Sequence, residues 1–359
     1  MENTILTYIK DNPYISQSEL AQKVGLSRPA VANYISKLVK SGKIVGRAYI
    51  LQDESRIICI GGANVDRKAK LTGPVQIGTS NIASFTQSCG GVARNVAENL
   101  GRLGCPTSLI TCTGDDKDGT WLLNHTAEHN VDTSQSFTLP AQATGTYTTI
   151  LQEDGYMFIA LDNMQIYENI DIDIIKTKLS YILSAHLVFV DANFSSDILA
   201  YIIEQSKYNN LNLCLSSISS YRANKLPSDL EGVSLLVGTK EEFEIIAGSV
   251  ISRPSDYLEV CKKIRRKGVK NIVLYLQKEG IFFLTEDGNH EFIRFADVNA
   301  VDTTGASDAL IAAILFGLSR GESFYKSCRM GIAAASLTMR TNETVYPNLT
   351  GTHLYNMTD

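Results

Sequence analysis

Short apolar segments alternate with helical segments from residue 56 onward, and this alternation limits the folds available to the chain. The apolar segments are too uniformly hydrophobic to leave one face in water, which is typical of strands buried on both sides. We therefore expect an α/β fold with a mostly parallel sheet, and ligands bound beyond the carboxyl ends of its strands. The expected strands are 57–60, 108–112, 187–190, 211–215, 235–237 and 272–276, and the expected helices are 92–103, 119–129, 198–205 and 257–267.

The first 51 residues follow a different pattern, that of three short helices and a hairpin. Ser16 and Glu19 have the spacing of a capping box at the start of the second helix. Residues 43–51 alternate in polarity as a short hairpin does. We expect two units, a head of residues 1–53 and a body of residues 54–359.

The charge is divided unevenly between these units. Residues 1–50 hold seven Lys or Arg and three acids, a net charge of +4, whereas the rest of the chain carries −9. A basic head on an acidic body predicts a polyanionic partner for the head. The segment ISQSELAQKVGLSRPAVANYISKL also resembles a winged helix-turn-helix. The resemblance implies DNA binding through the third helix and the wing, by Arg28, Asn33, Lys37 and Arg47.

Another interpretation of the head stays open. A small helical module that packs on the body or on another subunit would show the same helical pattern. Winged helix-turn-helix modules commonly bind two half-sites as dimers, so the resemblance also implies a homodimer.

In the body, residues 301–309 (VDTTGASDA) carry the most informative chemistry. A loop with two threonines and a glycine runs into an apolar helix, whose first amides lack intrahelical partners and favour an anion. Asp308 lies in the same first turn. Amides that stabilise a moving phosphoryl group, beside a carboxylate that accepts a hydroxyl proton, suit phosphoryl transfer to an alcohol. The alternative is an acidic residue that only stabilises the helix start.

A second segment at residues 88–104 (SCGGVARNVAENLGRLG) opens another helix with a glycine pair, and GDDKDG follows at 114–119. Together with residues 301–309, these segments resemble the ribokinase-like (PfkB) family of sugar and nucleoside kinases, over about residues 57–347. The resemblance implies a Rossmann-type α/β core with a small β lid, and an ATP-dependent kinase with ATP and Mg²⁺ as cofactors. It leaves open whether a monovalent cation such as K⁺ supports the anion site.

The same resemblance implies roles for individual residues. Asp308 would be the base, and the anion would be bound by the amides of Gly305, Ala306 and Ser307. The acceptor would be held by Asn64, Asp66, Gly90, Gly91 and Asn95, and from the lid by Thr146, Asp162, Asn163 and Met164. The nucleotide side would comprise Thr239, Glu242, Lys278, Gly280 and Thr303, with Asp191 and Glu242 as metal ligands. Arg94, between the glycine pair and Asn95, is expected to be solvated or to form an ion pair on the helix surface, and not to be catalytic.

Within the family, segments such as GGANVDRKA (61–69) and VDANFS (190–195) are most similar to pseudouridine kinases. This similarity implies that the 5′-hydroxyl of a nucleoside, most simply pseudouridine, accepts the phosphoryl group. A small-molecule nucleoside and ATP are therefore the expected partners of the body.

The chain departs from the family pattern mainly on the nucleotide side. Ser307 replaces a glycine in the G-A-G-D segment, and Thr239 replaces an asparagine in the N-x-x-E segment. Residues 277–280 keep one glycine of a glycine-rich turn, and Ser216-Ser217 replaces Asp-Pro. Two alternatives follow: a nucleoside-sensing transcriptional regulator with weak or no kinase activity, or a kinase for another nucleoside or sugar.

The remaining composition limits the compartment and the cofactors. Seven cysteines occur without a CxxC pair, which is typical of a reducing compartment, so we expect a cytoplasmic protein. No apolar run reaches the ~18 residues of a membrane span, so no membrane partner is expected. The five histidines are dispersed, which disfavours a histidine metal site.

Overall fold

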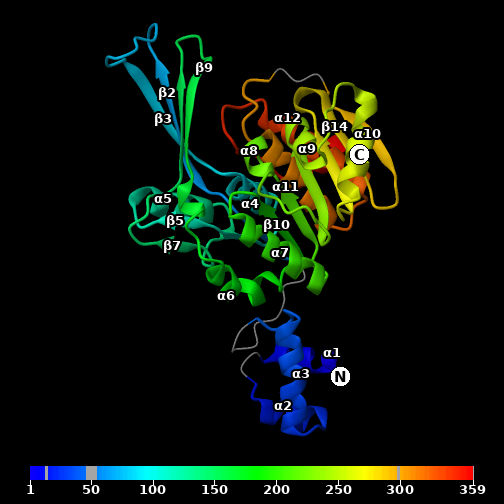
Figure 1. Ribbon diagram of the computed structural model, residues 1–359. Coiled ribbons are helices and arrows are strands. Elements are labelled where there is room, and N and C mark those ends of the chain that lie inside the picture. The colour runs from blue at the N-terminus through cyan, green and yellow to red at the C-terminus, as the bar shows by residue number, and fades with distance from the viewer. Residues whose placement is uncertain (13–14, 46–54, 297–299, 359) are drawn as a thin grey trace.

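The computed structural model describes residues 1–12, 15–45, 55–296 and 300–358. The head lies at one end of the body (Figure 1), where Gly42 of the head approaches Leu183 of the body so closely that a β-carbon on Gly42 would collide with it. Three helices form the head: α1 (Glu2–Asp11), α2 (Gln17–Val24) and α3 (Arg28–Lys40). The predicted capping box is present, because Glu19 N donates to Ser16 Oγ and Ser16 N donates to Glu19 Oε2. The helices pack around a small core that includes Ile5, Leu20, Val31, Ile35 and Leu38.

Part of the predicted head is outside the described residues. Residues 46–51 of the expected hairpin lie there, as do Arg47 and the expected boundary at residues 53 and 54.

The body contains a nine-stranded sheet, which confirms the predicted α/β class. Its order is β15-β14-β13-β12-β11-β10-β1-β4-β6, with all pairs parallel except β13–β14 and β14–β15. The strands are β1 (Ile57–Ile60), β4 (Thr107–Ile110), β6 (Val131–Asp132), β10 (Leu187–Asp191), β11 (Leu213–Ser216), β12 (Val233–Thr239), β13 (Asn271–Tyr275), β14 (Gly280–Leu284) and β15 (His290–Arg294).

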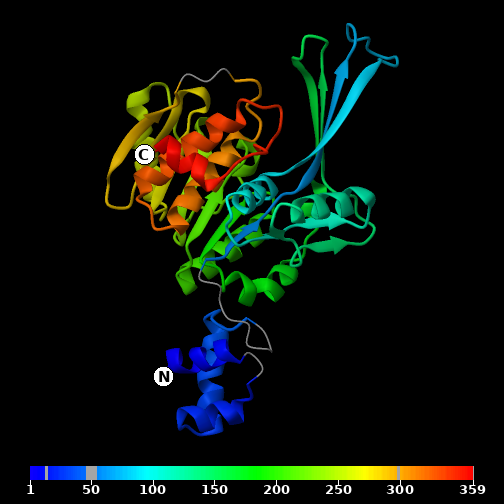
Figure 2. The same cartoon turned by 180° about the vertical axis from the view of Figure 1, so that it is seen from behind.

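Helices cover both faces of this sheet, as the uniformly apolar strands predict. On one face, Ile57 and Cys59 pack with α4 (Val92–Arg102), α11 (Ala306–Ser319), α12 (Phe324–Thr338) and α13 (Gly351–Thr358). On the other, Ile58 and Ile60 pack with α6 (Ile172–Ile182), α7 (Ser196–Asn209), α9 (Lys240–Ala247) and α10 (Tyr257–Arg265). Figure 2 shows α11, α12 and α13 in orange and red on the near side.

A four-stranded sheet extends from the body as a lid (Figures 1 and 2). Its order is β3-β2-β8-β9, made by β2 (Asn64–Leu71), β3 (Ala83–Gly90), β8 (Thr146–Leu151) and β9 (Met157–Asn163). The base of the lid is joined to the main sheet by α5 (Lys117–Ala127) and the short pair β5 (Cys112–Gly114) and β7 (Phe137–Leu139). The other short elements are α8 (Ser220–Ala223), η1 (Gln165–Tyr167), η2 (Pro254–Asp256) and η3 (Gln277–Glu279).

Among the helices in the described part of the chain, none is both long and apolar enough to cross a membrane.

Candidate active site

The turn that leads into α11 is shaped by one carboxylate and one glycine. Asp302 Oδ1 accepts hydrogen bonds from the amide and the hydroxyl of Thr304, at 2.9 and 2.7 Å. Gly305 then adopts φ 78°, and a β-carbon there would collide with the carbonyl oxygen of Thr344. Only glycine fits this position. The helix begins at Ala306, so the predicted anion-binding amides lie at its start, where the first amides lack partners within the helix. Of these amides, Ala306 N donates to the carbonyl oxygen of Thr303 at 3.3 Å.

Asp308, the predicted base, lies in that first turn and is 5% exposed. Burial raises its pKa from 3.8 to about 6, and the carboxylates of Asp191 and Asp66 add to the rise. Two hydrogen bonds oppose the rise, from Asn95 Nδ2 to Oδ2 at 2.8 Å and from Ser307 Oγ to Oδ1 at 3.2 Å. Near pH 7 the side chain is therefore mainly ionised, yet more basic than an exposed aspartate.

Arg94 forms an ion pair along its helix, which was one of the two expectations, but it is buried and does not lie on the helix surface. The side chain is 1% exposed, because α5 and the end of β3 cover this face of α4. Its Nη1 donates to Cys89 O at 2.9 Å and to Asn95 Oδ1 at 2.6 Å, and its Nε donates to Thr126 Oγ1 at 3.3 Å. Its Nη2 is ion-paired with the carboxylate of Glu98. The spacing of Arg94, Glu98 and Arg102 along one helix face agrees with the expected ion pair, but the burial of Arg94 and its hydrogen bond to Asn95 were not expected from the sequence.

Glu98 also belongs to a cluster with two histidines, His125 in α5 and His129 just after it. Ligand atoms of Glu98, His125 and His129 all lie within 4.8 Å of one another. However, Arg102 Nε donates to Glu98 Oε1 at 2.8 Å, and Arg102 Nη2 lies 3.0 Å from His129 Nε2. Burial, helped by Arg102, lowers the pKa of His129 to about 4. With two guanidinium groups on its one carboxylate, the cluster disfavours a metal cation and serves as an ion-pair network.

The predicted acceptor residues come together where β2 starts and β3 ends. Asn64 Nδ2 donates to Asp66 Oδ1 at 2.6 Å, and burial raises the pKa of Asp66. Opposite Asn64 lies Gly90, where a β-carbon would collide with the Asp66 carboxylate. Gly91 has φ 97°, and a β-carbon there would collide with the backbone of Gly62 and Ala63, in the turn that follows β1. The carboxylate of Asp66 is close enough to Asp308 to raise its pKa, and Asn95 donates a hydrogen bond to Asp308, so the three side chains belong to one site.

The predicted lid residues all lie at or near the base of the lid. Thr146 and Asn163 are paired across β8 and β9 at the base of the lid, and Met164 follows directly. The Asp162 carboxylate forms an ion pair of 2.9 Å with Arg222 Nη2 of α8, so it links the lid to the body. This pairing was not expected from the sequence.

Asp191 lies at the carboxyl end of β10, but its carboxylate accepts hydrogen bonds mainly from backbone amides. Its Oδ2 accepts from Gly62 N and Ala93 N, both at 2.9 Å, and its Oδ1 accepts from Asn193 N at 3.0 Å and Asn193 Nδ2 at 2.8 Å. The side chain is fully buried. Four protein donors use the lone-pair sites of a carboxylate, so this arrangement does not support the prediction of Asp191 as a metal ligand.

Comparison with known proteins supports the same interpretation of this site. Residues 54–350 match the model of the pfkB family carbohydrate kinases, and residues 3–45 match that of the winged helix-turn-helix DNA-binding modules. The chain belongs to the pfkB family. It is a sugar or nucleoside kinase with a winged helix-turn-helix at its N-terminus.

Relatives of this kinase cover both of its units. The chain is 27% identical to the uncharacterized sugar kinase YeiI of Escherichia coli (strain K12) over 348 residues, which are 97% of this chain and 96% of that one. It is 25% identical to the pseudouridine kinase of the same organism, over 83% of this chain and 95% of that protein. The structure of Arabidopsis thaliana ribokinase with ribose and ATP matches with a TM-score of 0.75 at 18% identity, over 85% of this chain and 98% of that one. That match confirms the ribokinase-like fold.

On the nucleotide side of this pfkB kinase, Glu242 is held by polar neighbours. Its Oε2 accepts from Ser217 Oγ at 2.7 Å and from Thr239 N at 3.2 Å, and it forms a capping box with Thr239 at the start of α9. Burial raises the pKa of Glu242, which is 4% exposed. Ser217 is a functional neighbour that sequence reasoning noted only as a departure. Thr239 and Glu242, which were predicted together, are thus in contact, and Ser217 also contacts Glu242.

The other predicted nucleotide residues lie on two loops, with Lys278 and Gly280 on one and Thr303 on the other. Lys278 is exposed in η3, the turn between β13 and β14. Gly280 ends this turn at φ 139°, where a β-carbon would collide with the carbonyl oxygen of Ile293. Thr303 is exposed just before α11. The structure gives none of these three a hydrogen bond to Asp308 or Glu242 within its described residues.

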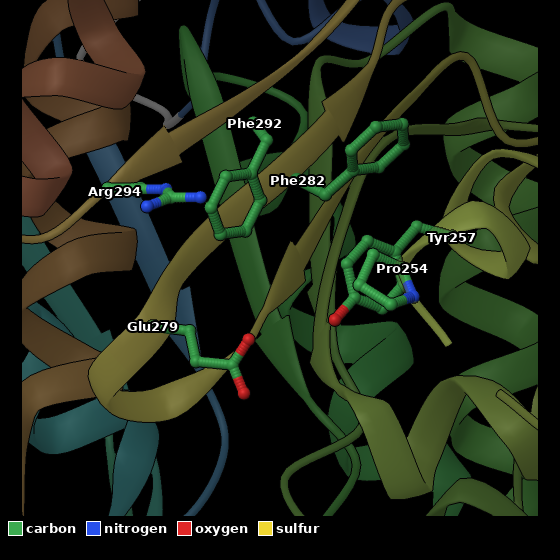
Figure 3. A pocket seen from close by; sticks show the side chains of 6 residues that line it. All are labelled: Pro254, Tyr257, Glu279, Phe282, Phe292 and Arg294. Atoms are coloured by element: carbon green, nitrogen blue, oxygen red, sulfur yellow. The ribbon is translucent and has the colours of Figure 1, made fainter. Parts of the chain in front are cut away.

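A pocket of about 500 Å³ adjoins the η3 turn (Figure 3). Aromatic rings line it together with one carboxylate and one guanidinium, from Pro254, Tyr257, Glu279, Phe282, Phe292 and Arg294. Phe282 packs toward α10, whereas its strand neighbours Ile281 and Phe283 pack toward α11. This pocket therefore opens on the face of the sheet opposite Asp308, and it is not part of the reaction site.

In the head, the predicted DNA-contacting residues that the structure describes share the recognition helix. Arg28 begins α3, and Asn33 and Lys37 follow on it one turn apart. All three side chains are exposed. Arg47, predicted on the wing, lies outside the described residues.

Proposed function

We propose that this kinase transfers the γ-phosphoryl group of ATP to the 5′-hydroxyl of a nucleoside, with pseudouridine as the acceptor. The observation that carries the proposal is the buried Asp308 in the first turn of α11, held by Asn95 beside Asp66. The likeness to a pseudouridine kinase over 95% of that protein supports the choice of acceptor.

In the proposed reaction, Asp308 accepts the proton of the 5′-hydroxyl. The hydroxyl oxygen bonds to the γ-phosphorus, and the bond from that phosphorus to the bridging oxygen of ADP breaks. The amides of Gly305, Ala306 and Ser307 donate to the oxygens of the moving phosphoryl group, an arrangement that stabilises its developing charge. Asn64 and Asp66 would hold the ribose hydroxyls, and Gly90, Gly91 and Asn95 would complete the ribose site. The nucleobase of the acceptor would lie against Thr146, Asp162, Asn163 and Met164.

The donor set on the nucleotide side fits one magnesium ion that keeps much of its water. Magnesium neutralises phosphate charge when it is bound with ATP. Apart from Asp191, Glu242 is the one carboxylate among the residues expected on the nucleotide side, so we assign its side chain to the hydrated ion. Thr239, Lys278, Gly280 and Thr303 would line the phosphates.

A second function is favoured by the same region. Because the carboxylate of Glu242 is engaged by Ser217 and Thr239, the nucleotide side is built differently from the family pattern. A nucleoside-sensing regulator with weak or no kinase activity would need the acceptor residues but not this side. A kinase for another nucleoside or sugar is the third candidate, since one relative is a guanosine-inosine kinase of Exiguobacterium acetylicum at 22% identity.

We further propose that the head binds DNA and controls transcription in response to the body's ligand. A ligand that favours one arrangement of head and body shifts DNA affinity by its difference in binding energy between the two arrangements. A cytoplasmic location is part of this proposal, and the buried free cysteines support a reducing compartment.

A homodimer would suit both units. Winged helix-turn-helix modules commonly bind paired half-sites. On the lid, Phe85, Ala69, Ile150 and Ile159 lie in one row across the four strands, and Phe85 and Ile159 are exposed. We propose that a second copy of the chain covers this apolar face.

The test is a phosphorylation assay with MgATP and a panel of pseudouridine, uridine, inosine, guanosine, cytidine, adenosine, ribose and fructose, with Asp308→Asn beside the wild type. Turnover of pseudouridine that the variant loses supports the kinase. Turnover of another acceptor supports the third candidate. Saturable nucleoside binding without turnover, with ligand-dependent DNA binding intact in Asp308→Asn, supports the regulator.

A further inference from the structure

Asp308 is connected to a buried charge that plays no part in the proposed transfer. Asn95 stands between them: its Nδ2 donates to Asp308 Oδ2 at 2.8 Å, and its Oδ1 accepts from Arg94 Nη1 at 2.6 Å. Arg94, Asn95 and Asp308 are all buried. The three side chains thus form a chain of hydrogen bonds with no water-exposed member.

The direction of this chain follows from the chemistry of its ends. A guanidinium has only donors, so the amide must turn its oxygen toward Arg94. The amide can then offer only N–H to Asp308. A donor toward a carboxyl oxygen stabilises the ionised carboxylate, whereas a carbonyl oxygen there would stabilise the protonated acid.

We propose that Arg94 is a positioning residue that fixes the orientation of the Asn95 amide and thereby keeps Asp308 ionised as a base. The inference rests on the proposed function only in naming Asp308 as the base. The orientation of the amide itself does not depend on any turnover.

Arg94 is well held for such a role. Its remaining donors are used by Cys89 O, Thr126 Oγ1 and the Glu98 carboxylate, so the guanidinium cannot turn without losing them. Glu98 balances its charge inside the protein and is itself paired with Arg102. The guanidinium can therefore stay buried and charged beside Asn95.

The ionisation of Asp308 matters because its environment opposes it. Burial raises its pKa to about 6. The charged and titratable groups that face it from neighbouring elements are Asp191 of β10, Asp66 of β2, Arg94 of α4 and Tyr275 of β13. Two of these are carboxylates, so a lost donor from Asn95 would move the titration of Asp308 toward or above neutral pH.

The experiment titrates Asp308 directly in the full-length protein, without ATP or nucleoside, by ¹³C NMR of aspartate labelled at the carboxyl carbon. Asp308→Asn identifies the signal. The main variant is Arg94→Met with Glu98→Met, since replacing both partners of a buried ion pair by apolar residues of similar volume often preserves stability. We expect the pKa of Asp308 to rise by about one unit or more in this variant.

Two further variants make the result specific. Arg102→Met removes the other guanidinium on Glu98 but does not touch Asn95, and it should leave the titration unchanged. In an Asn95→Ala background, the Arg94 and Glu98 substitutions should add much less shift than in the wild type, because Arg94 acts mainly through the amide and its direct charge effect on Asp308 is the smaller one. A shift of equal size in that background would show a direct charge effect and overturn the proposal.

Arg94→Lys covers the case in which the double variant does not fold. Lysine keeps the charge near Glu98 but lacks a second arm for Asn95, so an upward shift is again expected. An unchanged titration in folded Arg94→Lys or in the double variant would overturn the inference. A failure of the kinase assay would leave these titrations readable, so the two proposals fail separately. If turnover is present, the acid limb of kcat/KM should move with the NMR titration.

Discussion

The carboxylate of Asp191 accepts a hydrogen bond from the amide of Ala93 at 2.9 Å, across 98 residues of sequence. The same oxygen accepts from Gly62 N, so one side chain at the end of β10 ties the glycine turn after β1 to the start of α4. Because α4 carries Asn95, this carboxylate sets the position of the acceptor side of the site relative to the central sheet.

We expect Asp191→Ala to lower the free energy of unfolding by at least ~3 kcal/mol, because it leaves several buried amide donors without an acceptor, at about 1–3 kcal/mol each. Urea unfolding measures the loss, and Asp197→Asn, an exposed acid at the start of α7, should stay within about 0.5 kcal/mol of the wild type. Magnesium should not alter the difference. A mild, magnesium-dependent effect would restore Asp191 as a metal ligand.

The acid limb of the kinase reaction should report Asp308. With a pKa of about 6 for the base, kcat/KM should fall about tenfold per pH unit below that value. With an exposed aspartate as the base, kcat/KM would instead stay constant from neutral pH to about pH 4. The measurement is kcat/KM against pH from 4.5 to 9 with saturating MgATP. A flat profile down to pH 4.5 would mean that another group, or none, takes the proton.

Asp308→Asn should stabilise the fold while it abolishes turnover. A carboxyl with a raised pKa binds its proton more tightly in the folded protein, so its contribution to stability is full below about 3.8, declines up to about pH 6 and stays low above. Asparagine stays neutral, and we expect a gain of up to ~3 kcal/mol at pH 8 that shrinks toward pH 4. Urea unfolding at both pH values measures this, and an equal difference at the two would contradict it.

Glu242→Gln should separate metal binding from folding. Glutamine still caps α9, so the fold should persist, but the negative charge assigned to magnesium is lost. We expect the magnesium concentration for half-maximal rate to rise at least about tenfold, measured at fixed ATP. Ser217→Ala removes only one hydrogen bond to Glu242 and should raise the magnesium concentration for half-maximal rate by about fivefold. If Glu242→Gln behaves as the wild type, the ion is held elsewhere.

Much of the fold could be predicted from local patterns. The uniformly apolar strands and the loop at residues 301–309 indicated the sheet, its two covered faces and the position of Asp308. The capping box at Ser16 depends only on neighbouring residues, and the structure shows it as predicted.

The role of Arg94 could not be predicted, because its burial depends on α5 and on the end of β3, which lie far away in sequence. Arg94 was expected at the helix surface, yet Arg94, Asn95, Glu98 and Asn99 are all buried. For Asp191, the strand-end position was right and the partners were not, since backbone amides from two distant turns reach it. Contacts of this kind are set by tertiary packing, which local periodicity does not encode.

DNA binding by the head should depend on the exposed basic residues of α3. Arg28→Ala and Lys37→Ala should each weaken binding and reduce the slope of log K against log salt by about 1, because each removes a phosphate contact. Lys10→Ala is the matched control, since Lys10 is also exposed and basic but lies on α1. The measurement is fluorescence anisotropy with duplex DNA from the gene's own upstream region, from 50 to 200 mM salt. Equal slopes for all three variants and the wild type would identify the head as a packing or dimerisation module, and the regulatory proposal would then fail while the kinase proposal stands.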